Sequence, residues 1–302
     1  MNKVLITGLT GFIGKHLYKF LIDNDIEIVA IAKNPDLSLK NVTWIIGDLS
    51  SDVDIIISKL SHHIDTFDCL YHIAWSGVQA KDKNNYAIQA KNIDIAKNIV
   101  EICHYVGCTK FINSGTVAEY VHEDGLINDK CVPSPSDLYG VMKVTSKNLI
   151  GVMANSYQIN VINTIICSTY GEYRSDDNVI SYTIKSLLNN ESPKYGALNQ
   201  MWDFLYVEDV AHALYLIGQY GLCGKTYGIG GGRFKRLKEY ILDIQKIINP
   251  NIPIQIGALE EKYKQVLNSC VDSYLLQKDT GFFTEFSFEE GICKTINYYK
   301  NN

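Results

Sequence analysis

Short apolar runs rich in β-branched residues alternate with longer amphipathic segments through the first half of the chain. The short runs predict parallel strands buried on both faces, because such strands read as nearly continuous apolar sequence. They lie at 4–6, 26–32, 42–47, 69–73, 110–114 and 161–167. Helices are predicted near 12–23, 51–61, 84–107 and 137–157. This β-α-β order predicts an α/β fold with a doubly wound parallel sheet and right-handed crossovers.

The alternation weakens after about residue 168. Two strand-like runs and two helical patterns follow, at 204–207, 226–229, 208–220 and 236–248. We expect residues 1–167 to form one domain and residues 168–302 a smaller, mixed α/β domain. Residues 203–229 are expected to return partly to the first domain.

The first strand-like run leads directly into a glycine-rich turn, with glycines at 8, 11 and 14. A strand that enters such a turn and then a helix presents backbone N–H groups at the positive end of the helix dipole, where a pyrophosphate binds. The spacing differs from the commoner G-x-G-x-x-G, and an ordinary βα turn is the alternative. The flanking strand and amphipathic helix favour a dinucleotide, so we expect residues 1–167 to be the dinucleotide-binding domain and residues 168–302 the substrate domain. The predicted cofactor contacts in this turn are Gly8, Thr10, Gly11, Phe12, Ile13 and Gly14.

Composition narrows the class of partner. The chain is 46% hydrophobic and 20% charged, which is typical of a soluble globular protein. Its net charge of −5 gives no electrostatic reason to expect nucleic acid or an anionic membrane. No apolar run approaches the roughly 18 residues of a spanning helix, and the first strand begins too early for a signal peptide, so a cytoplasmic location is expected. The eight cysteines show no C-x-x-C spacing and the histidines no H-x-x-H or H-x-x-x-H spacing, which predicts reduced thiols and no metal site.

A tyrosine and a lysine four residues apart, Tyr139 and Lys143, share one face of a predicted helix. An ammonium beside a phenol lowers the phenol pKa from about 10, which makes Tyr139 a candidate proton donor or acceptor. One such pair is weak support in a chain with 20 tyrosines. Ser114 and Thr116 strengthen it, because they follow a predicted strand and ligands of a doubly wound sheet gather at the carboxyl ends of its strands. The alternative is two turn residues and a half-buried aromatic ring.

Taken in order, these motifs resemble the extended short-chain dehydrogenases/reductases, the branch of nucleotide-sugar epimerases, dehydratases and reductases. The resemblance runs from residue 2 to about residue 220. Its motifs lie at 7–14, 48–49, 72–74, 92, 114–116, 139–143, 170–171 and 203–209. The resemblance implies a Rossmann fold and an enzyme that uses a nicotinamide cofactor.

The resemblance also implies residue roles. Thr116, Tyr139 and Lys143 would be the catalytic triad, and Lys143 would also hold the nicotinamide ribose. The further implied cofactor contacts are Asp48 and Leu49 at the adenine, Ala74 along the cofactor, Asn92 and Ser114.

The end of the second predicted strand bears on the choice of cofactor. NAD-selective members carry an acid there that binds the ribose 2′-hydroxyl. This chain has Lys33 instead, and a cation suits the 2′-phosphate of NADP(H). We therefore predict NADP(H) as the cofactor. The alternative is NAD(H), with Lys33 at the surface and Asp36 as the ribose contact.

Departures from the family pattern narrow the reaction. The 4,6-dehydratases carry Asp-Glu after the catalytic threonine, whereas Val117 and Ala118 follow Thr116 here. The 4-epimerases keep NAD bound, which does not suit Lys33. We therefore expect NADPH-dependent reduction of the 4-keto group of a nucleotide-linked 6-deoxyhexose or related deoxysugar, in the synthesis of surface-polysaccharide sugars. A nucleotide-sugar 4-epimerase with bound NAD and a non-catalytic NADP-sensing protein remain alternatives.

The substrate side also departs from the family. Trp202 stands where many members have an arginine, and Ser168 stands where many have an asparagine. The predicted substrate contacts are Trp75, Thr116, Ser168, Arg174, Trp202 and Arg233. Candidates for the substrate diphosphate are Arg174, Lys194, Arg233 and Arg236.

Two predicted helices carry more apolar residues than one face of a sheet can cover. They span 84–107 and 137–157. Since the surplus predicts a subunit contact and the family commonly dimerises through these two helices, we expect a homodimer.

Overall fold

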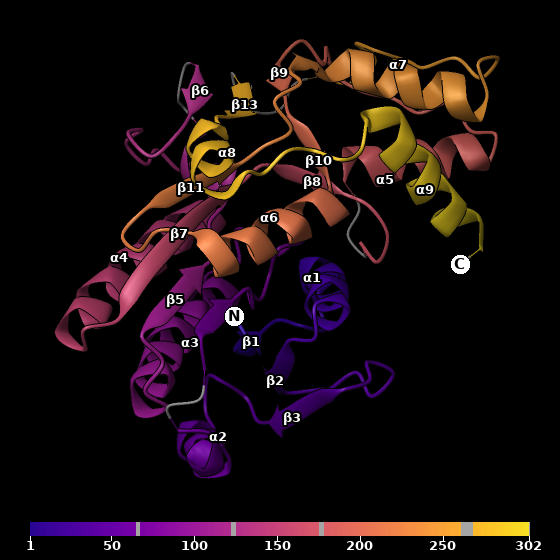
Figure 1. Cartoon of the computed structure of the whole chain (residues 1–302). Helices are drawn as coiled ribbons and strands as arrows, with labels where there is room; N and C mark the ends of the chain where they lie inside the picture. The colour runs from indigo at the N-terminus through magenta and orange to yellow at the C-terminus, as the bar shows by residue number, and fades with distance from the viewer. Residues whose placement is uncertain (65–66, 122–124, 175–177, 261–267, 302) are drawn as a thin grey trace.

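A seven-stranded parallel sheet forms the centre of the molecule, with strand order β11-β7-β5-β4-β1-β2-β3 (Figure 1). The computed structural model describes residues 1–64, 67–121, 125–174, 178–260 and 268–301. The strands of the central sheet are β1 (Lys3–Thr7), β2 (Glu27–Ala32), β3 (Val42–Ile46), β4 (Cys69–His72), β5 (Lys110–Asn113), β7 (Asn160–Ile166) and β11 (Thr226–Ile229). The order reverses between β1 and β4, so the predicted doubly wound parallel sheet is confirmed.

Helices cover both faces of this sheet. On one face lie α1 (Phe12–Asp23), α6 (Val207–Tyr220) and α8 (Tyr274–Thr280); on the other lie α2 (Val53–Leu60), α3 (Tyr86–Tyr105) and α4 (Leu138–Ser156). Successive strand residues point to opposite layers, as the pleat requires. Val4 and Ile6 pack into the core shared with α1, whereas Leu5 packs into the core shared with α3. Burial on both faces explains why these strands read as unbroken apolar runs.

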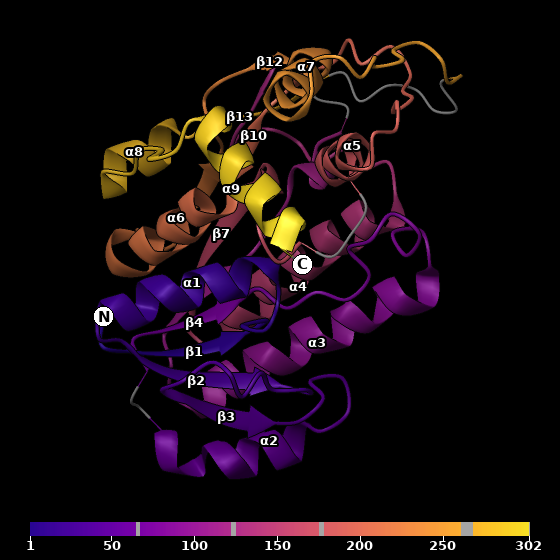
Figure 2. The ribbon, with the colours of Figure 1, turned by 90° about the vertical axis from the view of Figure 1, so that its right-hand side faces the viewer.

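The C-terminal half adds two small sheets and three helices at the end of the molecule away from α2 (Figure 2). Strand β10 (Phe204–Tyr206) pairs with β8 (Ser168–Tyr170). The other small sheet has the order β12-β9-β13-β6. Its strands are β6 (Leu126–Ile127), β9 (Met201–Trp202), β12 (Lys235–Arg236) and β13 (Asn268–Val271), and the helices are α5 (Val179–Leu188), α7 (Leu237–Ile248) and α9 (Phe288–Asn301). These helices enclose a separate apolar core built on Ile184, Ile244 and Ile292.

Two segments from the second half of the chain belong to the central sheet and to the helices that cover it. Strand β11 pairs with β7 at the edge of the central sheet, and α6 packs along α1. The residues that follow β1, β2, β4 and β5 line one cleft together with Trp202 of β9, so the carboxyl ends of these strands lie on the side of the small sheets.

The structure also bears on membrane spans, thiols and metal sites. Among the described residues, none of the helices combines the length and apolarity that crossing a membrane requires. All eight cysteines are free, and five of them are buried: Cys69, Cys103, Cys108, Cys167 and Cys270. Within the same described ranges, no group of three His, Cys, Asp or Glu side chains could hold a metal ion.

Candidate active site

A cleft of about 1180 Å³ runs along the carboxyl edge of the central sheet. One end is formed by the glycine turn after β1 and by Lys33 and Asp48, which follow β2 and β3. Thr116 and Tyr139 line the middle. Trp202 lines the other end, in the small sheet. A concave site of this size, at the point where the strand order reverses, has room for a dinucleotide and a second ligand.

The glycine turn is shaped for close backbone approach. Gly8 has a positive φ of 84°, and a Cβ there would lie 2.6 Å from the backbone nitrogen of Ala74. A Cβ on Gly14 would overlap the carbonyl of Gly8. Gly11 is the N-cap residue of α1 and has no side chain to cap the helix. The N–H groups of the first turn are therefore available to a phosphate, which fits the diphosphate of a nicotinamide dinucleotide.

Lys33 and Asp48 lie together at the end of the cleft that the glycine turn also forms. The ammonium nitrogen of Lys33 is 3.0 Å from a carboxylate oxygen of Asp48, and its side chain is 71% exposed. Hydrogen bonds from Ser50, with a contribution from Lys33, lower the pKa of Asp48 to about 2. Asp36 is paired with Lys15 at 2.9 Å. Lys33, rather than Asp36, thus lines the cleft.

Asn92 supports the loop after β4 from behind. Its side chain is buried, accepts a hydrogen bond from the Ser76 backbone N–H at 2.8 Å and donates to the Ser76 carbonyl at 3.1 Å. Ala74 and Trp75, in the same loop, line the cleft. Asn92, predicted as a cofactor contact, does not line the cleft and bonds to this loop through Ser76.

The three predicted catalytic residues meet in the middle of the cleft. The Tyr139 phenol is hydrogen-bonded to the Thr116 side chain. Lys143 is buried and donates a hydrogen bond from its ammonium to the Ser114 carbonyl at 2.8 Å. They converge because β5 ends just before Ser114 and α4 begins at Leu138, with its N-cap Asp137 accepting from the Gly140 N–H.

Removal from water governs the acidity of both ionisable groups. It raises the pKa of Tyr139 to about 12, against the smaller effect of the Thr116 hydrogen bond. It lowers the pKa of Lys143 to about 8, against the attraction of Glu119. A lowered tyrosine pKa was expected from the neighbouring ammonium, and the direction found is the opposite. The Lys143 ammonium is directed at Ser114 and at the ring of Trp75, and burial of the phenol prevails.

Trp75 contacts the side chains of both Tyr139 and Lys143. The Lys143 ammonium lies 4.1 Å from the centroid of the indole, and the Tyr139 ring meets it edge to face at 6.0 Å. The indole N–H donates to the Gln89 side chain at 3.0 Å. Because Gln89 is itself buried and donates to the Gly77 carbonyl, the position of the indole is fixed.

The predicted substrate residues fall into two groups. Ser168, Arg174 and Trp202 line the cleft, and Arg174 donates to the Thr169 carbonyl at 2.5 Å. The other three cations do not line it: Lys194 is exposed, Arg236 is the N-cap residue of α7, and Arg233 lines a second cavity.

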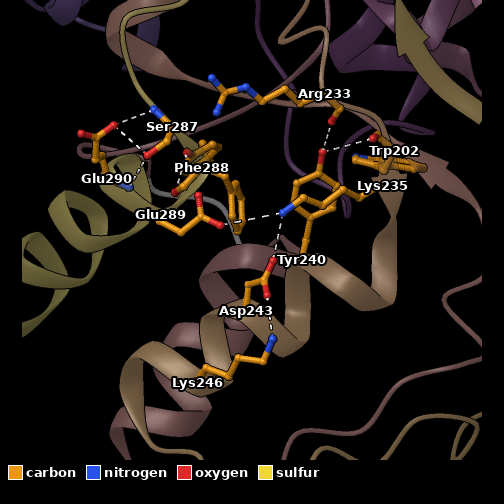
Figure 3. Close-up of polar contacts among 11 residues, drawn as sticks. Trp202, Arg233, Lys235, Tyr240, Asp243, Lys246, Ser287, Phe288, Glu289 and Glu290 are labelled. Atoms are coloured by element: carbon orange, nitrogen blue, oxygen red, sulfur yellow. Dashed lines mark hydrogen bonds and ion pairs between the residues drawn. The ribbon is translucent and has the colours of Figure 1, made fainter.

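That second cavity is small, about 100 Å³, and largely aromatic. Figure 3 shows the Arg233 carbonyl accepting a hydrogen bond from the Tyr240 hydroxyl. Lys235 lies between Asp243 at 3.0 Å and Glu289 at 3.9 Å. The structure therefore does not bring Arg233 to the cleft, since the fold of the β11–α7 connection is set by the packing of the C-terminal half.

Glu119 belongs to none of the motifs singled out from the sequence. It ends the short 3₁₀ helix η2 (Val117–Glu119), is 1% exposed, and accepts a hydrogen bond from the Thr116 N–H at 3.0 Å. Burial raises its pKa. The T-x-x-E spacing of Thr116 and Glu119 is that of a capping box, and this signal could have identified it.

Comparison with known proteins shows that the model of the NAD dependent epimerase/dehydratase family matches residues 4–230. A dTDP-glucose 4,6-dehydratase of Escherichia coli is 27% identical over 99% of this chain and 94% of its own length. A trifunctional UDP-glucose 4,6-dehydratase/epimerase/reductase of Arabidopsis thaliana, RHM2, is 26% identical over the whole chain, which spans about half, 47%, of that protein.

Two solved structures share the fold. The UDP-glucose 4-epimerase of Thermotoga maritima, solved with UDP-glucose, matches with a TM-score of 0.88 and 21% identity over 99% of both chains. The UDP-glucuronic acid 4-epimerase of Bacillus cereus, solved with UDP-glucuronic acid and NAD, matches with a TM-score of 0.85 and 22% identity over 99% of both chains. At these identities the likeness shows the fold alone.

Proposed function

The chain belongs to the NAD dependent epimerase/dehydratase family, and we propose that it reduces the 4-keto group of a nucleotide-linked 6-deoxyhexose or related deoxysugar with NADPH. Such a reaction would supply sugars for a surface polysaccharide. The observation that carries the proposal is the meeting of Thr116, Tyr139 and Lys143 in a cleft where the next two residues, Val117 and Ala118, are apolar.

These three residues can donate a proton to the sugar oxygen and stabilise the negative charge that develops during the reaction. A bound NADPH would supply the hydride to C4. Tyr139 has a pKa of about 12 and is therefore protonated near neutral pH. It donates this proton to the C4 oxygen as negative charge develops there. Thr116 donates a hydrogen bond to the same oxygen. The positive charge of Lys143, one helical turn along α4 and bonded to the Ser114 carbonyl, would stabilise the phenolate left on Tyr139 through space and without a direct bond.

The same cleft does not equip the chain for water elimination. Elimination needs an acid and a base beside the sugar. Among the described residues that line the cleft, the carboxylates are Asp48 and Asp137. Asp48 is held by Lys33 and Ser50 at the cofactor end, and Asp137 caps α4. Glu119 is turned back onto Thr116 and does not line the cleft.

The cofactor preference rests on Lys33. Its ammonium is exposed at the end of β2 and lines the cleft, where a ribose 2′-phosphate would meet it. Because Lys33 already neutralises Asp48, that carboxylate opposes a phosphate less than a free one would. We propose NADP(H), with NAD(H), the cofactor present in the Bacillus cereus epimerase structure, as the alternative.

We propose that residues 1–167 hold the cofactor and residues 168–302 the sugar nucleotide, with Arg174 at the diphosphate and Trp202 near the nucleotide. We also propose a homodimer through α3 and α4. Tyr86, Val141 and Val152 lie exposed on these two helices, at 68%, 39% and 74%. Exposed apolar side chains on adjacent helices suit contact with a second copy.

The 4-epimerase is the second candidate, because the same trio serves it when the cofactor is retained. The test mixes the protein with NADPH and a panel of nucleotide-linked 4-keto-6-deoxyhexoses and follows the absorbance of the reduced nicotinamide. Stoichiometric loss of absorbance with one ketone supports the reductase. Interconversion of 4-epimeric nucleotide sugars without net cofactor consumption indicates the epimerase. NADPH binding with turnover of neither substrate class indicates a sensor.

A further inference from the structure

The turn that carries Thr116 is held by a buried carboxylate, Glu119, that does not line the cleft. Glu119 Oε1 accepts the Thr116 backbone N–H at 3.0 Å, and the Thr116 hydroxyl accepts the Ala118 N–H at 3.3 Å. Both bonds close a single turn that presents Thr116 to Tyr139. The turn is tightly packed, since a Cβ on Gly115 would lie 2.8 Å from Glu119 Oε1.

The second carboxylate oxygen of Glu119 faces α4. Oε2 is buried, has no hydrogen-bond partner among the residues that the structure describes, and lies 3.9 Å from the Lys147 ammonium. Lys147 donates to the Tyr120 hydroxyl at 3.0 Å, so it is shared between the two groups. Lys143 is one helical turn before Lys147 and is itself buried, whereas the Lys147 side chain is 22% exposed. The buried Glu119 carboxylate therefore lies beside the Lys147 ammonium, in the part of α4 that also carries Lys143.

We propose that Glu119 is a positioning residue for the catalytic trio, which fixes Thr116 through one oxygen and supplies the buried counter-charge of Lys143 through its carboxylate. The proposal rests on the proposed function for the role of the trio. It adds that the positive charge of Lys143 is balanced by Glu119, a residue that does not line the cleft. A buried ammonium needs such a partner, because an uncompensated buried charge loses its proton.

The groups that act on Glu119 and Lys143 come from several elements. From α4 these are Lys147, Lys143 and Tyr139; from the end of η2, Tyr120; and from β4, His72, whose buried ring is kept neutral by a pKa lowered to about 3. The Glu119 carboxylate raises the pKa of both Lys143 and Tyr139. Removal of its charge is therefore expected to lower both.

The experiment separates the hydrogen bond from the charge. Glu119→Gln keeps an oxygen for the Thr116 N–H and removes the charge, whereas Glu119→Ala removes both. Glu101→Gln is the matched control, because Glu101 pairs with Lys97 on α3, away from the trio. The pKa of Lys143 is read by NMR of ¹³C-labelled lysine side chains, with the signal assigned from Lys143→Arg.

We expect a Lys143 pKa near 8 in the wild type and in Glu101→Gln, and a lower one in Glu119→Gln. With an active ketone, the alkaline limb of the kcat profile should move to lower pH in the same variant, and Glu119→Ala should lose about 10- to 100-fold in kcat at every pH. An unchanged Lys143 pKa in folded Glu119→Gln overturns the proposal. If the wild type turns over no ketone, the proposed function fails, while the NMR measurement still decides the role of Glu119.

Discussion

The ammonium nitrogen of Lys143 lies 4.1 Å from the centre of the Trp75 indole, between that ring and the Ser114 carbonyl. A cation over an aromatic face is stabilised by the ring quadrupole, more strongly where water is excluded. The indole is itself anchored to Gln89. The structure thus places a tryptophan, expected only as a substrate contact, against the lysine that we propose to be catalytic.

We expect Trp75→Leu to lower kcat about 3- to 30-fold, the range of a partly desolvated cation–π contact, because Lys143 loses the ring that holds its ammonium. Trp75→Phe keeps an aromatic face and loses only the N–H bond to Gln89, so its loss should be smaller. Steady-state kinetics of the two variants check this. Equal losses in kcat would show that the ring face does not act on Lys143.

Tyr139→Phe should lower turnover by at least about 100-fold and leave NADPH binding nearly unchanged. The substitution removes the phenolic proton and the hydrogen bond to Thr116, while the glycine turn is untouched. NADPH affinity, measured by fluorescence titration, is the control for folding. Substantial turnover in this variant would contradict the role given to Tyr139.

The reduction rate should fall as pH rises through about 8. The pKa of Lys143 is lowered to about 8 by burial, so the ammonium is present below that pH and is lost above it. Without the ammonium, the phenolate formed on Tyr139 is no longer stabilised. Initial rates between about pH 6 and pH 10, at saturating NADPH, measure this limb. A rate that stays flat across pH 8 would argue against a catalytic ammonium.

Lys33→Ala should weaken NADPH binding roughly tenfold, the value of one charge-assisted hydrogen bond, and leave NADH binding nearly unchanged. The reason is that Lys33 lies on the cleft, whereas Asp36 is paired with Lys15. Lys59→Ala is a matched control, because Lys59 bonds to the Ile46 carbonyl on an exposed surface. Equal affinity of the wild-type protein for NADPH and NADH would end the proposed preference.

Local patterns were sufficient for the parts of the site that the backbone fixes. The predicted helix at 137–157 is α4 at Leu138–Ser156, and the glycine turn lies where β1 meets α1. Because parallel strands end at one edge, Thr116 and Tyr139 had to meet there. The direction of individual side chains depends on tertiary packing. Asn92 therefore holds a loop, and Arg233 lies in another cavity.

The small sheets could not be predicted from the pattern of hydrophobic and polar residues either. Strands β6, β9 and β12 are each two residues long, which is too short to show alternation. The buried environment that raises the pKa of Tyr139 depends on residues from separate segments. The T-x-x-E capping box at Glu119 was present in the sequence, but that its carboxylate would be buried beside Lys147 depended on α4.

Asp203 makes the stability of the protein depend on pH. It is fully buried between β9 and β10, where both carboxylate oxygens accept the Gly231 N–H at 3.0 Å, and burial raises its pKa to about 7. The unfolded chain ionises this group near pH 4, so between about pH 4 and pH 7 the folded state binds more protons. Stability is then expected to fall as pH rises through this window.

Asp203→Asn should remove this contribution, since the amide does not titrate. We expect the thermal midpoint of the variant to depend less on pH between about 4 and 7 than that of the wild type, measured by circular dichroism at several pH values. Asp94→Asn, on the exposed face of α3, serves as the control and should keep the wild-type dependence. A wild-type pH dependence retained in Asp203→Asn would mean that other groups, such as the buried Asp209 with its pKa raised to about 6, produce the effect instead.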